Sequence, residues 1–232
     1  MNSTLEDTKA EINGLLENQY KTVSSALRRS MKAFEDFDCD LADSVTAISE
    51  DIEQTHHKTE DLIFNAITTH QPRDIELRRF IAYLNTSSGL HSVGRFATKI
   101  SEIVILSEGL DHFKELITLP YLSELADSAL SMSFRAVLDE NLNEIDELEK
   151  LEAQSDNESA EMFQEIAEYL SYRRDISNIA MLYVIVGRYF ERATDQAIAI
   201  AEAAVYLVTG ERKKLGLAYK GIQDISDLVL DI

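Results

Sequence analysis

A sustained stripe of apolar residues toward the carboxyl end of the chain is the strongest constraint on its fold. The members recur in alternating steps of three and four residues, the spacing that keeps one face of a helix apolar. This spacing predicts one long helix packed against neighbouring helices, so the stripe is interpreted as core rather than as a cofactor site. The stripe consists of Ile176, Ile179, Tyr183, Val186, Phe190, Ala193, Ala197, Ile200, Ala204 and Leu207.

Five further helices are predicted, because the chain contains few residues that break helices. Only 8 Gly and 2 Pro occur among 232 residues. Pro72 disfavours helical geometry in Gln71, and Gly210 is a usual helix stop. Thr118 is a candidate N-terminal cap, with Pro120 in the first turn that follows it. The six predicted helices span residues 5–37, 41–70, 75–107, 118–138, 142–171 and 174–209.

The two halves of the chain resemble each other, with a period of about 100 residues. VGRFATKISE at residues 93–102 aligns with ATDQAIAIAE at residues 193–202, and this alignment pairs Glu102 with Glu202. Three helices in each half enclose a core, so we expect an all-α fold of two tandem three-helix bundles. The predicted parts are a first repeat at residues 1–110, a second repeat at residues 111–211, and a tail at residues 212–232 with room for one short helix.

The charge of the chain limits its partners. A formal net charge of −20 repels phosphate backbones and anionic lipid, which disfavours direct binding to nucleic acid or membranes. Cys39 is the only cysteine, so no internal disulfide can form. No signal-peptide pattern and no apolar run of about 18 residues are visible. We expect a cytoplasmic protein that reaches a membrane only through its partners.

Carboxylates gather on the polar side of the last predicted helix. Glu191, Asp195 and Glu202 lie within about 40° of one another around that helix. Glu152 and Asp156 lie one turn apart in a polar window of the preceding helix. Oxygen ligands of this kind bind hard cations, Fe or Zn. A solvated acidic face or a docking surface for a partner explains the same spacing.

Histidines mark the second predicted helix. His56 shares a helix face with Glu60, and His57 shares one with Asp61. Imidazole and carboxylate together bind transition metals, whereas solvated surface histidines show the same pattern. Glu53 and His56 have the Glu-x-x-His spacing of di-iron bundles, but a second copy is missing. No phosphate-binding loop, nucleophile elbow or paired Cys motif occurs, so no enzymatic activity is expected.

Taken together, the stretches at residues 70–80, 89–102 and 189–211 resemble the PhoU family, the accessory regulators of phosphate-specific transport. The strongest is YFERATDQAIAIAEAAVYLVTGE at residues 189–211, which is similar to the family's second-repeat signature. HQPRDIELRRF at residues 70–80 and GLHSVGRFATKISE at residues 89–102 are similar to segments of the first repeat. The resemblance covers about residues 5–211 and implies a fold of two three-helix bundles, the same fold that the internal repeat predicts.

The resemblance also implies a surface metal motif of Fe or Zn in the second repeat. Glu191 and Asp195 occupy the family's Glu/Asp-x-x-x-Asp positions, Glu202 matches the later Glu, and Ala199 replaces the usual Asn. Glu152 and Asp156 match the acidic pair of the preceding helix. In the first repeat the equivalent positions carry other residues. These are His91, Arg95 and Lys99 on one helix, and Ser49 and Glu53 on the other. We therefore expect one metal site at most, in the second repeat.

The function that the resemblance implies is negative regulation of phosphate uptake and phosphate-starvation signalling. Such a protein binds the ATP-binding subunit of a phosphate ABC transporter, a sensor kinase, or both. Two alternatives stay open: a carboxylate-bridged metal store or metal-dependent enzyme, and a helical adaptor for a different transporter. An exposed apolar stripe on a two-bundle protein commonly drives self-association, so we expect a homodimer.

Overall fold

Helices make up nearly all of the secondary structure in the computed structural model, which describes residues 4–107 and 109–219. No β-strand occurs in these two ranges. The elements are α1 (Leu5–Asp36), α2 (Cys39–Ala47), α3 (Ser49–His70), α4 (Asp74–Leu106), α5 (Thr118–Leu138), α6 (Ile145–Tyr172), the 3-10 helix η1 (Arg174–Ile176) and α7 (Ser177–Thr209). The predicted all-α fold is confirmed.

Several helix ends follow the chemistry of the sequence. At the start of α1, the Asp7 N–H donates to the Thr4 hydroxyl over 3.1 Å, and the Thr4 N–H donates to the Asp7 carboxylate over 3.0 Å. This reciprocal pair satisfies backbone donors that the first turn leaves free. Helix α3 ends at Gln71, directly before Pro72, and α7 ends at Gly210 with a left-handed φ of 77°. Both of these ends were predicted.

One predicted helix is divided in two, and one predicted cap is wrong. The predicted second helix is interrupted at Ile48, which separates α2 from α3. Near the break, the Ser44 and Thr46 hydroxyls donate to backbone carbonyls of their own helix, a side-chain bond that competes with regular helix geometry. Thr118 is the first residue of α5 and not its cap, because Ile117 already has helical backbone angles.

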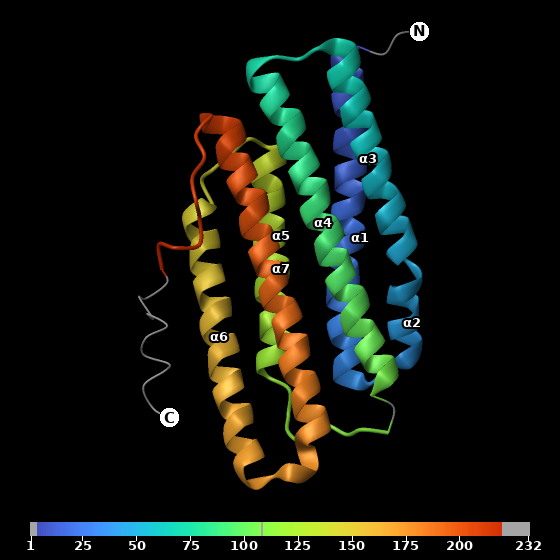
Figure 1. The fold of residues 1–232 in the computed structure, drawn as a ribbon, viewed down its shortest axis with the longest axis vertical. Helices are drawn as coiled ribbons and strands as arrows, with labels where there is room; N and C mark the ends of the chain where they lie inside the picture. Colours follow the sequence, from blue (N-terminus) through green and yellow to red (C-terminus); the bar gives the residue numbers. More distant parts are fainter. Residues whose placement is uncertain (1–3, 108, 220–232) are drawn as a thin grey trace.

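The predicted short helix of the tail falls mostly outside the described residues. Residues 211–219 are described, and they form no helix. Figure 1 shows that this segment turns at the end of α7 and runs back beside α6.

Four inner helices are covered by three outer ones, of which α2 and α3 form one broken pair (Figure 1). Helices α1, α4, α5 and α7 contact one another through the pairs α1–α4, α5–α7, α4–α7 and α1–α5. The broken pair α2 and α3 covers α1 and α4 on one flank, and α6 covers α5 and α7 on the other. Each half is thus a three-helix unit, and two helices of each half meet two of the other.

Aromatic and polar side chains join the two halves. The Tyr20 and Phe134 rings stack with centroids 4.4 Å apart, linking α1 to α5. Asp127 accepts hydrogen bonds from Ser24 over 2.6 Å and from Arg28 over 2.7 Å. Every member of the predicted apolar stripe, which begins in η1 and continues along α7, is at most 5 % exposed, so its assignment to the core is confirmed.

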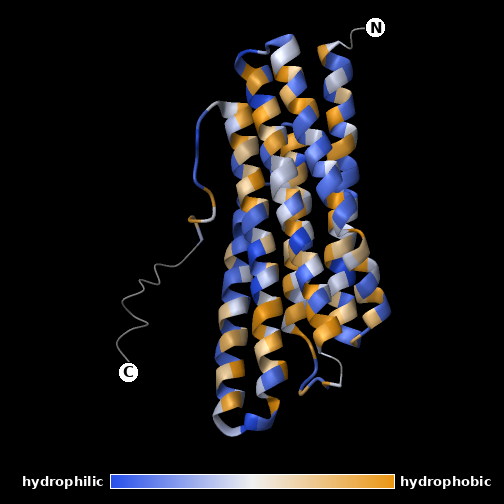
Figure 2. Cartoon of the chain, turned by 45° about the vertical axis from the view of Figure 1, so that its right-hand side comes forward, coloured by the Kyte–Doolittle hydropathy of each residue, from blue (hydrophilic) through white to orange (hydrophobic). Residues whose placement is uncertain are grey.

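Each helix carries both hydrophobic and hydrophilic residues. Figure 2 shows the two kinds alternating along the helices, as expected for helices with one buried and one solvated face. Within residues 4–107 and 109–219, no helix is long and apolar enough to cross a membrane.

Candidate functional site

The acids of the second half cluster first around Glu191 on α7. The Arg188 guanidinium donates to Glu191 Oε1 over 2.6 Å, while Glu191 Oε2 is buried without a hydrogen-bond partner. Burial raises the pKa of Glu191, and the negative charges of Asp156 and Asp195 raise it further against the opposing charge of Arg188. Crowded negative charge of this kind favours an added proton or cation.

Glu152 and Glu202 lie in a second group, which the tail covers. Glu152 is 3 % exposed, and its neighbour Glu149 is 6 % exposed. Glu202 Oε1 accepts the backbone N–H of Leu215 over 3.0 Å and lies 3.2 Å from Lys214 Nζ. The chain itself thus supplies the positive groups at this end of the acidic face.

The five predicted metal ligands therefore do not converge on one point. Glu191 and Glu202 are eleven residues apart, which is about 16 Å along an α-helix. Among the residues that the structure describes, no three His, Cys, Asp or Glu side chains are arranged to hold a metal ion. The carboxylates of Asp156 and Asp195 place negative charge around Glu191. A metal ion bound there stays a prediction.

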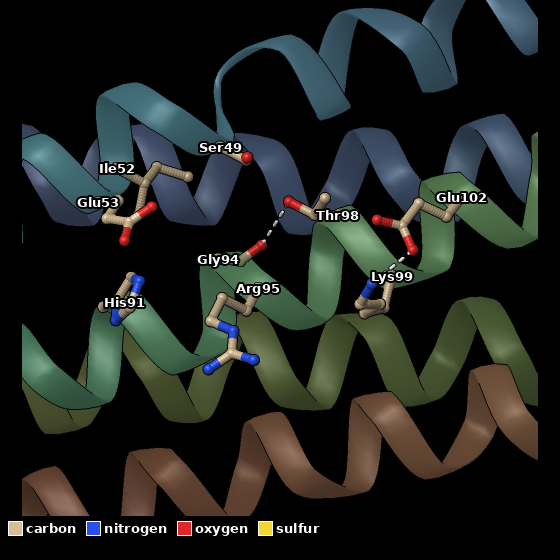
Figure 3. Close-up of a pocket in the computed structure, with 9 residues that line it drawn as sticks. All are labelled: Ser49, Ile52, Glu53, His91, Gly94, Arg95, Thr98, Lys99 and Glu102. Carbon is tan, nitrogen blue, oxygen red and sulfur yellow. Dashed lines mark hydrogen bonds and ion pairs between the residues drawn. The ribbon is translucent and has the colours of Figure 1, made fainter.

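The equivalent positions of the first half line a single pocket between α3 and α4 (Figure 3). The pocket has a volume of about 280 Å³. In Figure 3, Glu53 and His91 face each other across it, and Lys99 is paired with Glu102 at 2.6 Å. The complete lining is Ser49, Ile52, Glu53, His91, Gly94, Arg95, Thr98, Lys99 and Glu102. Arg95 and Lys99 bring positive charge to a place where the second half carries acids.

His56 is part of the core. It is 7 % exposed, so the interpretation of this residue as a surface histidine is wrong, whereas His57 is exposed. Its Nδ1 lies 2.9 Å from the Ser87 hydroxyl, which donates onward to Gln19. Since Ser87 donates to Gln19, His56 Nδ1 donates to Ser87, and its Nε2 lies 3.5 Å from Glu60.

A stack of two histidines joins α3 to α4. The rings of His56 and His91 are 4.8 Å apart and nearly parallel, at 12°. Burial lowers the pKa of both residues. This contact was not predicted, because sequence spacing relates residues on one helix and not the register between two helices. Glu149 was missed for another reason: only the fold-back of the tail distinguishes it from the other acids of α6.

The PhoU family model, described as the PhoU domain, matches the chain twice, at residues 16–104 and 119–204. Each match lies within one three-helix half. Two curated relatives carry the name phosphate-specific transport system accessory protein PhoU homolog. The chain is 23 % identical over 193 residues to homolog 1 of Thermotoga maritima, covering 83 % of both chains. It is 28 % identical over 194 residues to the protein of Borreliella burgdorferi, covering 80 % of this chain and 86 % of the relative.

Two solved structures share the fold. The crystal structure of PhoU from Pseudomonas aeruginosa superposes with a TM-score of 0.86 at 19 % identity, covering 90 % of this chain and 100 % of that one. The phosphate transport system regulatory protein PhoU from Streptococcus pneumoniae superposes with a TM-score of 0.78 at 21 % identity, covering 91 % and 98 %.

Proposed function

The chain belongs to the PhoU family, and we propose that it is an accessory protein of a phosphate-specific transport system that restrains phosphate uptake and phosphate-starvation signalling. The observation that carries the proposal is the double match of the PhoU domain, one match in each three-helix half. The curated relatives are named as accessory proteins of such a system. This proposal extends their role to the present chain.

The proposed mechanism is a bias between two states of a partner. The chain binds, in the cytoplasm, the ATP-binding subunit of a phosphate ABC transporter, a sensor kinase, or both. Binding one state of the partner more tightly than the other shifts the partner toward the tightly bound state. A rigid bundle suits this role, because its four inner helices hold the outer faces in a fixed arrangement.

Deletion of the gene under high phosphate tests the regulatory role. We expect phosphate uptake and a starvation reporter to rise in the deletion strain and to return to the parental level when the gene is supplied in trans. Purified chain should also retain the transporter's ATP-binding subunit or the kinase on an affinity column. Uptake and reporter activity that do not change on deletion would contradict the proposal.

As a second candidate function, we propose that Glu191 and Asp195 bind Fe or Zn. Support comes from the buried Glu191 Oε2, which lacks a hydrogen-bond partner, and from the raised pKa that burial, Asp156 and Asp195 produce. A cation at this position would compensate the crowded negative charge. Asp and Glu oxygens ligate Zn in proteins, and Glu carboxylates ligate Fe in di-iron helix bundles.

Metal content by mass spectrometry, measured before and after loading with Fe and Zn, tests this candidate. We expect bound metal in the wild type and its loss in Glu191→Ala/Asp195→Ala. The matched control is His91→Ala/Arg95→Ala, which changes the equivalent positions of the first repeat and should retain the metal. A metal-free wild type after loading would refute the site and leave these acids as a solvated or docking face.

We also propose that the chain forms a homodimer. Leu106 and Ile117, which flank the connection between α4 and α5, are 83 % and 70 % exposed. Large apolar side chains on a surface often mark contacts between proteins. Light scattering coupled to size exclusion should give twice the chain mass for the wild type and a smaller mass for Leu106→Glu/Ile117→Glu. A monomeric wild type would rule the dimer out.

A further inference from the structure

The described tail, residues 211–219, is fastened to α6 and α7 by a series of specific contacts. The Leu215 N–H donates to Glu202, and the Gly216 N–H donates to Glu149 over 3.0 Å. The Tyr219 hydroxyl donates to Asp146 over 2.5 Å. We use the name tail-covered face for the acids beneath this segment, which are Asp146, Glu149, Glu152 and Glu202.

Packing of Leu215 and the close fit of Gly216 also hold the tail in place. Leu215 is 2 % exposed and joins the hydrophobic core, whereas Leu217 is 63 % exposed. Gly216 has a left-handed φ of 76°, and a Cβ at that position would lie 3.2–3.4 Å from the Glu152 carboxyl group. The left-handed backbone angle favours glycine at this position, and a larger residue would also displace the Glu152 carboxyl group.

An ion pair joins the tail to this face, between Lys214 and Glu202. The described tail carries the basic run Arg212, Lys213 and Lys214 in a chain with a net charge of −20, and the Arg212 guanidinium lies over the Tyr206 ring. The face beneath carries four carboxylates, of which Glu149 and Glu152 are nearly fully buried. Burying a carboxylate is costly unless donors or cations compensate it, and here backbone N–H groups of the tail donate to Glu149 and Glu202. The face thus has the properties of a receptor for a segment that offers backbone N–H donors and a lysine.

We propose that the tail-covered face is a docking site for a short basic segment of a partner protein, and that residues 212–219 occupy it in cis until the partner displaces them. The segment that fits has a basic run, a leucine that enters the core beside α6 and α7, and a glycine directly after it. The inference goes beyond the proposed function, because it depends on the contacts of the tail and not on phosphate regulation.

Two matched variants of the full chain test whether the tail can be released from the tail-covered face. Leu215→Asp places a charge in the core and should release the tail, while Leu217→Asp adds the same charge at an exposed position and should not. Hydrogen exchange of the Gly216 amide reports release, because this N–H donates to Glu149. We expect slow exchange in the wild type and in Leu217→Asp, and fast exchange in Leu215→Asp.

The probe is a fluorescent peptide with the sequence of residues 212–219, RKKLGLAY. Fluorescence anisotropy should show binding to Leu215→Asp that is at least about tenfold tighter than binding to the wild type or to Leu217→Asp. Adding Glu149→Gln and Glu202→Gln to the Leu215→Asp chain should weaken binding by about tenfold or more. A peptide with valine in place of its glycine should not bind.

Equal, weak binding to all three chains, or binding that survives Glu149→Gln/Glu202→Gln, would overturn the proposal. If Leu215→Asp does not fold, Gly216→Val replaces it as the opening variant. Its control is Gly109→Val, because Gly109 has a similar left-handed φ of 82° but a Cβ at that position would meet nothing within 4 Å. Peptide binding and phosphate uptake are separate measurements, so failure of one proposal is distinguishable from failure of the other.

Discussion

Residues 91 and 191 occupy equivalent positions of the two repeats and carry opposite chemistry. His91 stacks on His56 between α3 and α4, and Glu191 faces Asp156 and Asp195 between α6 and α7. In both cases burial is the main cause of the pKa shift. Burial disfavours the charged form, so it lowers the pKa of the histidine and raises that of the glutamate. The equivalent position is partly buried in both repeats, and it carries a histidine in the first and a glutamate in the second.

The largest effect is expected where the two halves are alike. Leu90 and Phe190 are equivalent, and both are fully buried. Leu90→Ala should lower the free energy of unfolding by about 2–5 kcal/mol and Phe190→Ala by about 3–5 kcal/mol. Because α4 packs on α7, each variant should unfold in one transition when circular dichroism is followed in urea. Gly14→Ala, on an exposed helix face, serves as the control.

Two separate unfolding transitions in Leu90→Ala or Phe190→Ala would contradict the expectation that the two halves unfold together. They would mean that the halves are independent domains, despite the contacts between their inner helices.

A smaller effect distinguishes the first half by its pH dependence. Burial lowers the pKa of His91, with His56, Arg95 and His57 lowering it further and Glu53 opposing them. A lowered histidine pKa gives stability that is fully present above pH 6.5 and is lost as the pH falls below it. His91→Gln should reduce the acid loss of Tm between about pH 7.5 and 5 by about 2–4 °C.

The control for this prediction is His70→Gln at the far end of α3, which should keep the wild-type pH profile. An unchanged profile in His91→Gln would show that the histidine stack does not contribute to acid sensitivity.

The second half should respond to pH in the opposite sense, with a similar or smaller effect. Burial raises the pKa of Glu191, so its contribution to stability is full below pH 4.5 and is lost as the pH rises through the raised value. Glu191→Gln removes this loss and keeps an acceptor for Arg188. We expect the variant to be about 1 kcal/mol more stable than the wild type at about pH 7, with a smaller difference at about pH 4.

Thermal unfolding at the two pH values measures this difference, and Glu161→Gln on the exposed face of α6 is the control. A variant that is less stable than the wild type at neutral pH would contradict the description of Glu191 as a crowded, poorly compensated acid.

The smallest expected effect concerns the last shared acid of the repeats. Glu102 pairs with Lys99 on the surface, whereas Glu202 accepts the Leu215 N–H and contacts Lys214. Glu102→Gln should change the free energy of unfolding by less than about 0.5 kcal/mol. Glu202→Gln should cost about 0.5–1 kcal/mol and accelerate exchange of the Leu215 amide. Equal exchange in both variants would show that Glu202 does not hold the tail.

Local signals in the sequence were sufficient for most of the fold. The stripe on α7 identified its core face, and Pro72 and Gly210 identified two helix ends. The break at Ile48 was not predictable in the same way, because Thr46, Ala47 and Ile48 contain no glycine or proline. Hydroxyl groups that bond within the helix leave no clear mark on the hydrophobic period.

The candidate sites were less accessible to sequence reasoning than the fold. The spacing of Glu191 and Asp195 located an acidic cluster, but spacing within one helix cannot show that Glu202 belongs with the tail. The stack of His56 on His91 depends on the register between α3 and α4. The contact of Gly216 with Glu152 requires the chain to reverse direction after α7, which only the folded structure reveals.

Gly210 also determines how strongly the tail competes for its own binding face. Since α7 stops there, a short link of residues 211–214 delivers Leu215 to its position, so the tail is present at an effective concentration on the order of millimolar. A free partner at micromolar concentration with the same intrinsic affinity faces roughly a thousandfold disadvantage. A partner that is already held against the protein through another surface escapes this disadvantage, because its own local concentration is comparable. The tail therefore favours partners that are already bound nearby, and the sequence of the partner's segment matters only after that.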